Sequence, residues 1–363
     1  MKKNKNYVDL KDQPVPEGQH LLEVDDLKMY FHTEDGVVRA VDGVSYTLDR
    51  GETLGVVGES GSGKSVTAMT IMGLISMPPG KIEGGDVRYR GRSILEMTEE
   101  EMQHIRGNDI AMIFQDPMTS LNPVYKIGKQ VGEGLRLHRG YSKQEALKRA
   151  TELLDLVGIP EPEKRVNEYP HQFSGGMRQR VMIAMALACD PDILIADEPT
   201  TALDVTIQAQ IIELMQEMQQ KNGNAIIMIT HDLGVVADMA DNIMVMYAGR
   251  PVEFGTAEEI FYESRHPYTW GLIRSIPEQA IEEKKPLTPI HGNPPSLMNL
   301  PEGCVFSPRC PYATDKCRKQ RPERVVTESG HYSACHYSGD PEFLKNAPET
   351  SRTRKDSKKG GEA

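Results

Sequence analysis

The chain has 363 residues, of which 42 are lysine or arginine and 53 are aspartate or glutamate, so its formal charge at pH 7 is −11. A chain this acidic is not expected to bind nucleic acid through a broad surface that neutralises phosphates. Its hydrophobic fraction of 38% is too high for a disordered protein, and Asp190, Pro191 and Asp192 interrupt its longest apolar-rich segment, so we expect it not to span a bilayer.

The N-terminal part of the chain begins with a polar segment and continues with a pattern of alternating apolar and polar residues. Residues 1–20 carry lysines with no apolar segment behind them, which predicts a flexible lead rather than a secretory signal, and a cytosolic chain whose thiols stay reduced. From Leu21, apolar and polar residues alternate in LLEVDDLKMYF and VVRAVDGVSYTL. This alternation predicts antiparallel strands.

Three short apolar runs and two amphipathic segments predict an α/β core. The runs are TLGVVG, DILIAD and NAIIMIT, and each leads into a polar or glycine turn, which is typical of buried parallel strands. Residues 142–157 are predicted to form a helix, with Ser142 and Glu145 as a capping box. A second helix is expected from about residue 206 to residue 221, followed by Gly223.

The first of these strands is followed by GESGSGKS, which matches the phosphate-loop pattern G-x-x-x-x-G-K-[ST] between a strand and a helix. Its glycines let backbone N–H groups approach phosphates, and the helix N-terminus adds a favourable field. Lys64 is expected to reach the β- and γ-phosphates, and the Ser65 hydroxyl to bind Mg²⁺. The residues expected to contact the nucleotide here are Gly58, Ser60, Gly61, Ser62, Gly63, Lys64, Ser65 and Val66.

The segment ILIADE supplies the acidic half of the site. We expect Asp197 to bind the metal and Glu198 to lie beside the γ-phosphate, where it can orient or deprotonate the attacking water. Together with the phosphate loop, this pair predicts a P-loop NTPase.

A second anion-binding element, FSGGMRQR, lies between the two nucleotide motifs. Ser174 is the expected cap of the helix that begins here, and Gly175, Gly176 and Met177 follow it. One nucleotide has room for only one phosphate-cradling loop on a given side. This element is therefore expected to act on the nucleotide of a neighbouring subunit, in a head-to-tail dimer.

With these motifs in this order, residues 21–260 resemble the ATP-binding-cassette (ABC) family. The resemblance implies a RecA-like core, an antiparallel β subdomain and an α-helical subdomain at about residues 115–180. It also implies that Gln115 links the metal and the attacking water to the helical subdomain and that His231 contacts the γ-phosphate. Two further roles follow from it: Asp204 at the dimer seam, and Phe31, with Tyr30 as the alternative, stacking on adenine.

The sequence departs from the family signature Leu-Ser-Gly-Gly-Gln, because Phe173 and Met177 stand at its two ends. The serine and both glycines are present, so we expect this half-site to bind phosphate. The stretch from Gln115 to Pro123 is the expected docking region for membrane partners.

Beyond the cassette, residues 261–340 contain RHPYTWGLIRSIP and GNPPSLMNLPEGCVFSPRC, and residues 341–363 are predicted to be disordered. This small cysteine-containing domain resembles the C-terminal region of D-type ATPase subunits from oligopeptide and dipeptide importers. The resemblance implies ATP and Mg²⁺, a homologous second ATPase, two permeases, an external solute-binding protein that acts indirectly, and a peripheral place on the cytoplasmic face of the membrane. The alternatives are a nickel-chelate importer ATPase and a non-transport ABC ATPase that acts on a macromolecule.

Four of the five cysteines lie in or just after this region: Cys304, Cys310, Cys317 and Cys335. Their spacing is neither that of a zinc ribbon nor that of a ferredoxin, so spacing alone leaves a metal site and four unligated thiols open. The family resemblance implies a [4Fe–4S] cluster that acts as a structural clip, with zinc or no metal as alternatives and His331 and His336 as substitute ligands. The fifth, Cys189, is expected to be a small core residue.

Overall fold

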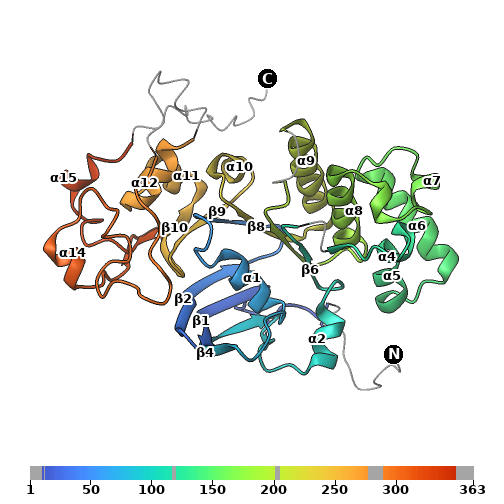
Figure 1. Ribbon diagram of the computed structural model, residues 1–363, viewed down its shortest axis with the longest axis horizontal. Helices are drawn as coiled ribbons and strands as arrows, with labels where there is room; N and C mark the ends of the chain where they lie inside the picture. Colours follow the sequence, from blue (N-terminus) through green and yellow to red (C-terminus); the bar gives the residue numbers. More distant parts are fainter. Residues whose placement is uncertain (1–9, 12, 117–119, 201–204, 277–288, 349–363) are drawn as a thin grey trace.

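The computed structural model describes residues 10–11, 13–116, 120–200, 205–276 and 289–348 (Figure 1). Within them, a four-stranded antiparallel sheet has the order β2–β1–β4–β5. Its strands are β1 (Leu22–Thr33), β2 (Gly36–Leu48), β4 (Gly80–Tyr89) and β5 (Arg92–Ser93). β1 and β2 form a long hairpin, so the antiparallel pairing predicted from the alternating pattern is confirmed.

The second sheet contains eight strands in the described residues, in the order β11–β12–β10–β9–β3–β8–β7–β6. In that order their bounds are Val325–Val326, Tyr332–Ser333, Arg250–Thr256, Asn242–Tyr247, Thr53–Val57, Ala225–Thr230, Ile193–Asp197 and Ile110–Ile113. The five strands from β9 to β6 are parallel. The three predicted core strands are β3, β7 and β8, and every residue in them is buried.

The parallel part of the main sheet is covered on both faces, which explains why its strands are nearly continuous apolar runs rather than alternating. In β7, Ile193 and Ile195 pack into the core shared with the antiparallel sheet. Leu194 and Ala196 point the other way, into the core beneath the helices. The period-2 geometry of a strand thus joins the two hydrophobic cores through one segment.

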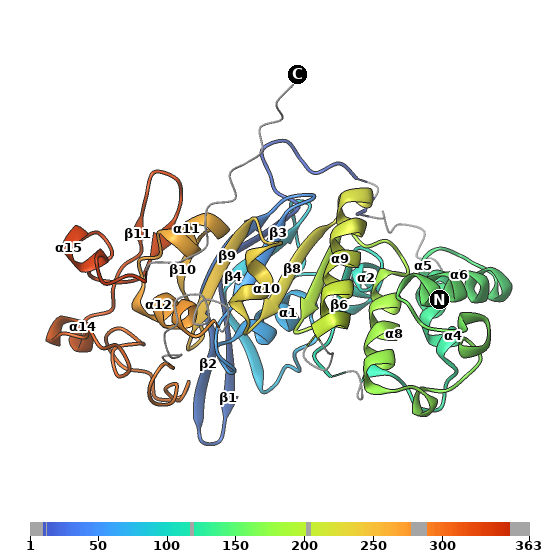
Figure 2. The same cartoon turned by 90° about the horizontal axis from the view of Figure 1, so that it is seen from above.

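Helices flank the main sheet, and one group lies beyond β6, at one end of the sheet (Figures 1 and 2). The group beyond β6 consists of α4 (Ile127–Val131), α5 (Glu133–His138), α6 (Lys143–Leu156), α7 (Pro162–Arg165), η1 (Pro170–Gln172) and α8 (Gly175–Leu187). The others are α1 (Lys64–Ile71), α2 (Glu99–Ile105), α9 (Val205–Asn222), α10 (Leu233–Ala237), α11 (Ala257–Tyr262), α12 (Pro267–Arg274), α14 (Asp315–Lys319) and α15 (Pro341–Leu344). No helix in the described ranges has the length and hydropathy needed to cross a membrane.

Both helices predicted from the sequence are present. α6 begins after Ser142, whose hydroxyl accepts a hydrogen bond from the Glu145 N–H while the Glu145 carboxylate accepts one from the Ser142 N–H. It ends before Gly158, which has a positive φ of 70°. α9 buries Ile211 and Met215 on its inner face, as the helical spacing predicted.

Two segments expected to be flexible contain packed side chains. In the N-terminal lead, Leu10 is only 1% exposed and belongs to the core under the antiparallel sheet. At the other end, Phe343 of α15 packs against Trp270 and Tyr337. The expectation of flexibility therefore does not hold at Leu10, which lies in a core, or at Phe343, which is half-buried against two aromatic rings.

The cysteine-containing segment continues the main sheet rather than forming a detached unit. β12 pairs with β10 through Tyr332 and Phe254, whose rings stack 5.7 Å apart. The chain after residue 260 thereby adds β12 and β11 to the edge of the cassette's own sheet (Figure 2). Groups from this segment are consequently held at fixed positions relative to the strands that carry the phosphate loop.

Candidate nucleotide site

The phosphate loop connects the end of β3 to the start of α1. Gly58 and Gly63 have positive φ angles of 153° and 101°. A Cβ atom on Gly58 would lie 2.2 Å from the Met246 carbonyl oxygen, and one on Gly63 would lie 2.3 Å from that of Ala40. Only glycine fits these two positions, so the loop can pack closely against the backbone at Met246 and Ala40.

Lys64 lies at the centre of the loop and is almost completely buried. Its Nζ donates to the carbonyl oxygens of Gly58 at 2.7 Å and Glu59 at 3.0 Å. Burial lowers the pKa of Lys64, while the carboxylates of Glu198, Asp197 and Glu59 act in the opposite direction. The loop therefore holds a poorly hydrated ammonium group whose present partners are neutral carbonyls, and an anionic phosphate would bind it more strongly.

The predicted metal ligands lie next to each other. The Ser65 hydroxyl donates to the Asp197 carboxylate at 3.0 Å, which links the start of α1 to the end of β7. Burial raises the pKa of Asp197, and the hydrogen bond from Ser65 opposes this effect. A hydroxyl and a carboxylate oxygen are the hard donors that Mg²⁺ prefers, so these residues fit the cation expected with a nucleotide.

Glu198 follows Asp197, and each of its two carboxylate oxygens contacts a polar side chain. Gln115 Nε2 donates to its Oε2 at 2.9 Å, and His231 Nδ1 lies 3.3 Å from its Oε1. The Glu198 backbone has a φ of 46°, and its N–H donates to the Ile229 carbonyl of β8 at 2.9 Å. A turn in the left-handed region thus directs this carboxylate toward the two polar side chains rather than along the strand.

These groups border one small hollow of about 100 Å³ at the carboxyl ends of the parallel strands. Its lining residues are Ser60, Gly61, Ser62, Gly63, Lys64, Ser65, Val66, Gln115 and Glu198. Asp197 lies next to this hollow and accepts a hydrogen bond from Ser65, which lines it. The Gly58 carbonyl oxygen accepts a hydrogen bond from Lys64, another lining residue. The structure therefore brings together the phosphate loop, the acidic pair, Gln115 and His231.

Other predicted nucleotide residues lie outside this hollow. Phe31 is on β1, half-buried, and packs against the core of the antiparallel sheet. Ser174 caps α8 as predicted, accepting from the Met177 N–H at 3.3 Å, but its loop does not line the phosphate hollow of its own chain. The predicted role of Asp204 falls outside the described residues.

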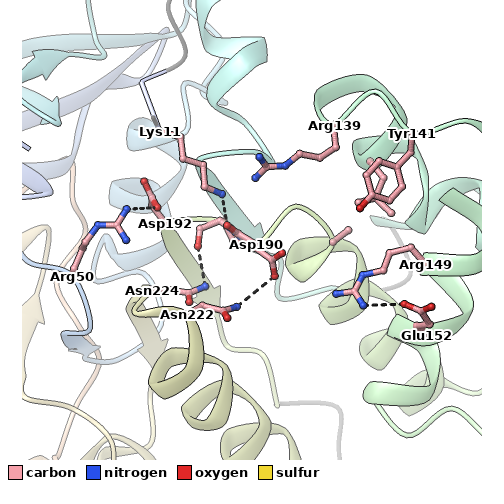
Figure 3. Close-up of a pocket in the computed structure, with 13 residues that line it drawn as sticks. Lys11, Arg50, Arg139, Tyr141, Arg149, Glu152, Asp190, Asp192, Asn222 and Asn224 are labelled. Atoms are coloured by element: carbon pink, nitrogen blue, oxygen red, sulfur yellow. Dashed lines mark hydrogen bonds and ion pairs between the residues drawn. The ribbon is translucent and has the colours of Figure 1, made fainter. Parts of the chain in front are cut away.

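A larger cavity of about 730 Å³ lies at the opposite ends of the strands (Figure 3). Asp192 immediately precedes β7, and Asn224 immediately precedes β8. The cations around the cavity already have partners: Arg50 pairs with Asp192 at 2.7 Å, and Lys11 donates to the Cys189 carbonyl at 3.1 Å. We therefore place the nucleotide in the smaller hollow, where the phosphate loop is.

The four C-terminal cysteines are all free thiols that border one cavity, with Phe306 and Tyr312 among its other walls. Burial raises the pKa of Cys310 to about 11 and that of Cys335 to about 12. Within the described ranges, no three His, Cys, Asp or Glu side chains converge so as to hold a single metal ion, so the predicted metal site is not confirmed.

The two histidines named as substitute ligands are engaged elsewhere. His331 Nε2 lies 3.0 Å from the buried carboxylate of Glu253, and the residue itself is buried. His336 borders the cysteine cavity, but its Nε2 contacts the Gln320 carbonyl at 2.9 Å. The prediction for His331 is therefore wrong, because its ring nitrogen pairs with a carboxylate inside the sheet edge.

Sequence reasoning missed three residues that meet beside the phosphate loop. Glu59 occupies a variable position of the loop motif, and its carboxylate pairs with Arg309 from the cysteine-containing segment at 2.5 Å. Its N–H donates to the Tyr268 hydroxyl at 2.8 Å. Both partners lie in the C-terminal stretches singled out by resemblance, but nothing in their spacing pointed to the loop.

Known proteins are similar to this chain over most of its length. A family profile described as ABC transporter matches residues 41–201, and one described as Oligopeptide/dipeptide transporter, C-terminal region, matches residues 252–317. The oligopeptide transport ATP-binding protein OppD of Bacillus subtilis (strain 168) is 58% identical over 312 residues, covering 86% of this chain and 87% of that protein. The dipeptide transport ATP-binding protein DppD of Escherichia coli (strain K12) is 52% identical over 320 residues, covering 88% and 97%.

Solved structures show the same core fold. The ATP-binding cassette MJ0796, in a dimeric post-hydrolysis state bound to ADP and Pi, superposes with a TM-score of 0.60 at 28% identity. The similarity covers 65% of this chain and 98% of that one. The cassette fold predicted from the motifs is thereby confirmed.

Proposed function

Because the chain belongs to the ABC transporter family of oligopeptide and dipeptide transport ATP-binding proteins, we propose that it is the ATP-hydrolysing motor subunit of a peptide importer. The observation that carries this proposal is the contact of Glu198 with Gln115 and His231 beside the phosphate loop. That arrangement gives one carboxylate two polar neighbours at the place where the γ-phosphate of ATP would lie.

Hydrolysis follows from the chemistry of these side chains. Lys64 exchanges its carbonyl partners for phosphate oxygens when ATP binds. Ser65, Asp197 and Gln115 would hold Mg²⁺, which supplies charge neutralisation on the phosphates. Glu198 accepts a proton from the attacking water, and Gln115 and His231 keep its carboxylate in place. Phe31 is proposed to stack on the adenine ring.

We propose that the complete ATP site forms only between two subunits. Ser174, Gly175, Gly176 and Met177 begin α8, whose N-terminus is open to an anion, and they do not line the hollow of their own chain. They would therefore contact the nucleotide held by a homologous second ATPase, with Asp204 at the seam. ATP-driven closure of the two cassettes then supplies the mechanical step, and hydrolysis resets it.

The membrane partners are proposed to dock beside Gln115. Phe114, Val124 and Tyr125 expose apolar side chains on the two sides of this stretch, and Val124 is 71% exposed. Exposed apolar side chains on either side of a stretch whose first residue contacts Glu198 suit a surface that couples a permease to ATP hydrolysis. The subunit would thus lie peripherally on the cytoplasmic face, under two permeases served by an external solute-binding protein.

Purification of the membrane complex tests this assignment. The chain is expected to co-isolate with two integral membrane subunits, and ATP hydrolysis by the complex is expected to rise with a peptide-loaded binding protein. Val124→Asp should lower co-isolation, whereas Val326→Asp, which alters a similarly exposed valine on β11, should not.

Three outcomes would contradict parts of the proposal. Stimulation by a nickel chelate but not by peptides would favour the nickel-importer alternative. Isolation without any membrane subunit would favour an ABC ATPase that acts on a macromolecule. If both valine variants co-isolated equally with the membrane subunits, this stretch would not be the docking surface.

The four-cysteine cavity supports a second proposal, that Cys304, Cys310, Cys317 and Cys335 bind a [4Fe–4S] cluster. Four thiols on one cavity form the ligand set that such clusters require. Cluster irons are separate atoms, so the thiols need not converge on one point as they would for zinc. The raised pKa values of Cys310 and Cys335 mean that these two thiols stay protonated until a metal displaces their protons.

Anaerobic purification of the full chain checks this proposal by elemental analysis and visible absorbance. About four irons per chain and a brown colour are expected. Cys310→Ala should lose both, whereas Cys189→Ala, which changes a buried cysteine outside the cavity, should keep them. A colourless protein without iron would overturn the cluster, and zinc in its place would support the zinc alternative.

A further inference from the structure

The cysteine-containing segment contacts the phosphate loop directly through one arginine. Arg309 Nη1 and Nη2 donate to the two carboxylate oxygens of Glu59 at 2.5 Å and 2.9 Å. Glu59 is the second residue of the loop motif, and Arg309 immediately precedes Cys310. A two-pronged ion pair therefore joins the C-terminal segment to the loop that is expected to hold the phosphates.

The guanidinium group of Arg309 is held in one position. Its side chain is only 5% exposed. Nε donates to the His291 carbonyl at 2.9 Å, Nη2 to the Ile290 carbonyl at 3.2 Å, and Nη1 lies 3.3 Å from the Tyr247 hydroxyl. With the two bonds to Glu59, each of its five N–H groups has a partner, so the arginine acts as a fixed support rather than a mobile surface charge.

Glu59 is held at both its side chain and its backbone. Its N–H donates to the hydroxyl of Tyr268, a fully buried residue that packs against Tyr247 with ring centroids 4.6 Å apart. Its carbonyl oxygen accepts from Lys64 at 3.0 Å and from the Ser62 N–H at 3.2 Å. The backbone of Glu59 therefore connects the tyrosine and arginine supports to the lysine that is expected to bind phosphate.

The charge of Glu59 gives the ion pair a second effect. This carboxylate is close enough to raise the pKa of Lys64, so it would also repel the phosphates that bind there. Its hydrogen bonds raise the pKa of Arg309, as expected for a guanidinium that pairs with a carboxylate. With Arg309 in place, the loop carries a neutral pair; without it, the loop carries an uncompensated negative charge.

We propose that Arg309 is a positioning residue for the ATP site, which fixes the phosphate loop through Glu59 and cancels the negative charge of that residue. The C-terminal segment is then a part of the nucleotide site, acting in the same chain. This inference rests on the proposed nucleotide site and on the geometry of Glu59, Arg309 and Tyr268.

The inference is tested by measuring the equilibrium binding of ATP to the full chain with titration calorimetry. Arg309→Met keeps the aliphatic stem, and it is expected to raise the Kd for ATP about tenfold, since one unpaired charge then faces the phosphates. The double variant Glu59→Gln/Arg309→Met should recover most of the affinity, because it removes both charges. Arg309→Lys keeps the positive charge but cannot form both hydrogen bonds of the guanidinium group, so it should lose less affinity for ATP than Arg309→Met.

Two controls separate this inference from the site on which it rests. Arg318→Met, which removes an exposed arginine of α14, should bind ATP as the unmodified chain does. If Lys64→Ala also bound ATP normally, the nucleotide site itself would be wrong. If only Lys64→Ala lost affinity and Arg309→Met did not, or if the double variant bound as weakly as Arg309→Met, the role of Arg309 would be refuted. Should Arg309→Met fail to fold, Arg309→Lys decides the same question, because it should bind ATP more weakly than the unmodified chain and an unchanged affinity would refute the role of Arg309.

Discussion

Replacement of Glu198 by glutamine is expected to lower the rate of ATP hydrolysis by about 10²- to 10⁴-fold, which is the contribution of a well-placed general base. The amide has nearly the same shape as the carboxylate, so it can keep contacts with Gln115 and His231. It cannot take a proton from water. Steady-state phosphate release measures the loss, and ATP binding to the same variant should change little.

The matched control is Glu100→Gln, which removes an exposed carboxylate on α2. It should hydrolyse ATP as fast as the unmodified chain. Hydrolysis at the normal rate by Glu198→Gln would remove this residue from the role of base. A variant that also lost ATP binding would instead indicate that Glu198 supports the structure of the hollow.

The strands and helices around the site could be predicted because their signals are local. β3, β7 and β8 are short apolar runs, and because they are buried on both faces, no polar residue interrupts them between their ends. The capping box at Ser142 and Glu145 marked the start of α6, since both of its hydrogen bonds lie within one helical turn. Patterns of this kind predict a local structure without any knowledge of distant contacts.

The acidic half of the site was predictable for a related reason. Parallel strands end at the same edge of the sheet, so a residue after β7 and one after β8 meet there. This places His231 beside Glu198 although they come from different strands. Gln115 follows β6 at the same edge and joins them. Three short motifs far apart in the chain thus needed only the sheet to bring them together.

The contact between Glu59 and Arg309 could not be predicted in this way. The two residues are 250 positions apart, and a single glutamate in a glycine-rich loop has no partner that spacing can identify. The same holds for Leu10 and Phe343, which lie in polar segments whose average composition predicted flexibility. In each case one side chain outweighs the composition of its segment, because tertiary packing depends on individual contacts.

The cysteines illustrate what chemistry and spacing leave undecided. The thiols of Cys304, Cys310, Cys317 and Cys335 do border one cavity, although their sequence spacing matches no common metal motif. Their gathering depends on the path of the C-terminal chain over the edge of the main sheet, which their spacing does not encode.

Lys64→Ala should weaken ATP binding by roughly 10- to 100-fold, the value of one charge-assisted hydrogen bond in a site that excludes water. The ammonium group is buried, and burial lowers its pKa, so little of its hydration remains to be lost when phosphate binds. The ATP-induced rise in the melting temperature of the full chain reports this affinity directly. At an ATP concentration near the Kd of the unmodified chain, that rise should be nearly absent in the variant.

Melting temperatures measured without nucleotide separate the effect of Lys64→Ala on folding from its effect on ATP binding. Lys64 now donates to two loop carbonyls, of Gly58 and Glu59, so its removal costs some stability as well as affinity. Lys148→Ala, at an exposed position of α6, serves as the control and should keep both the melting temperature and the ATP-induced rise. A full ATP-induced rise in Lys64→Ala would show that the phosphates lie elsewhere, whatever the stability of the nucleotide-free variant.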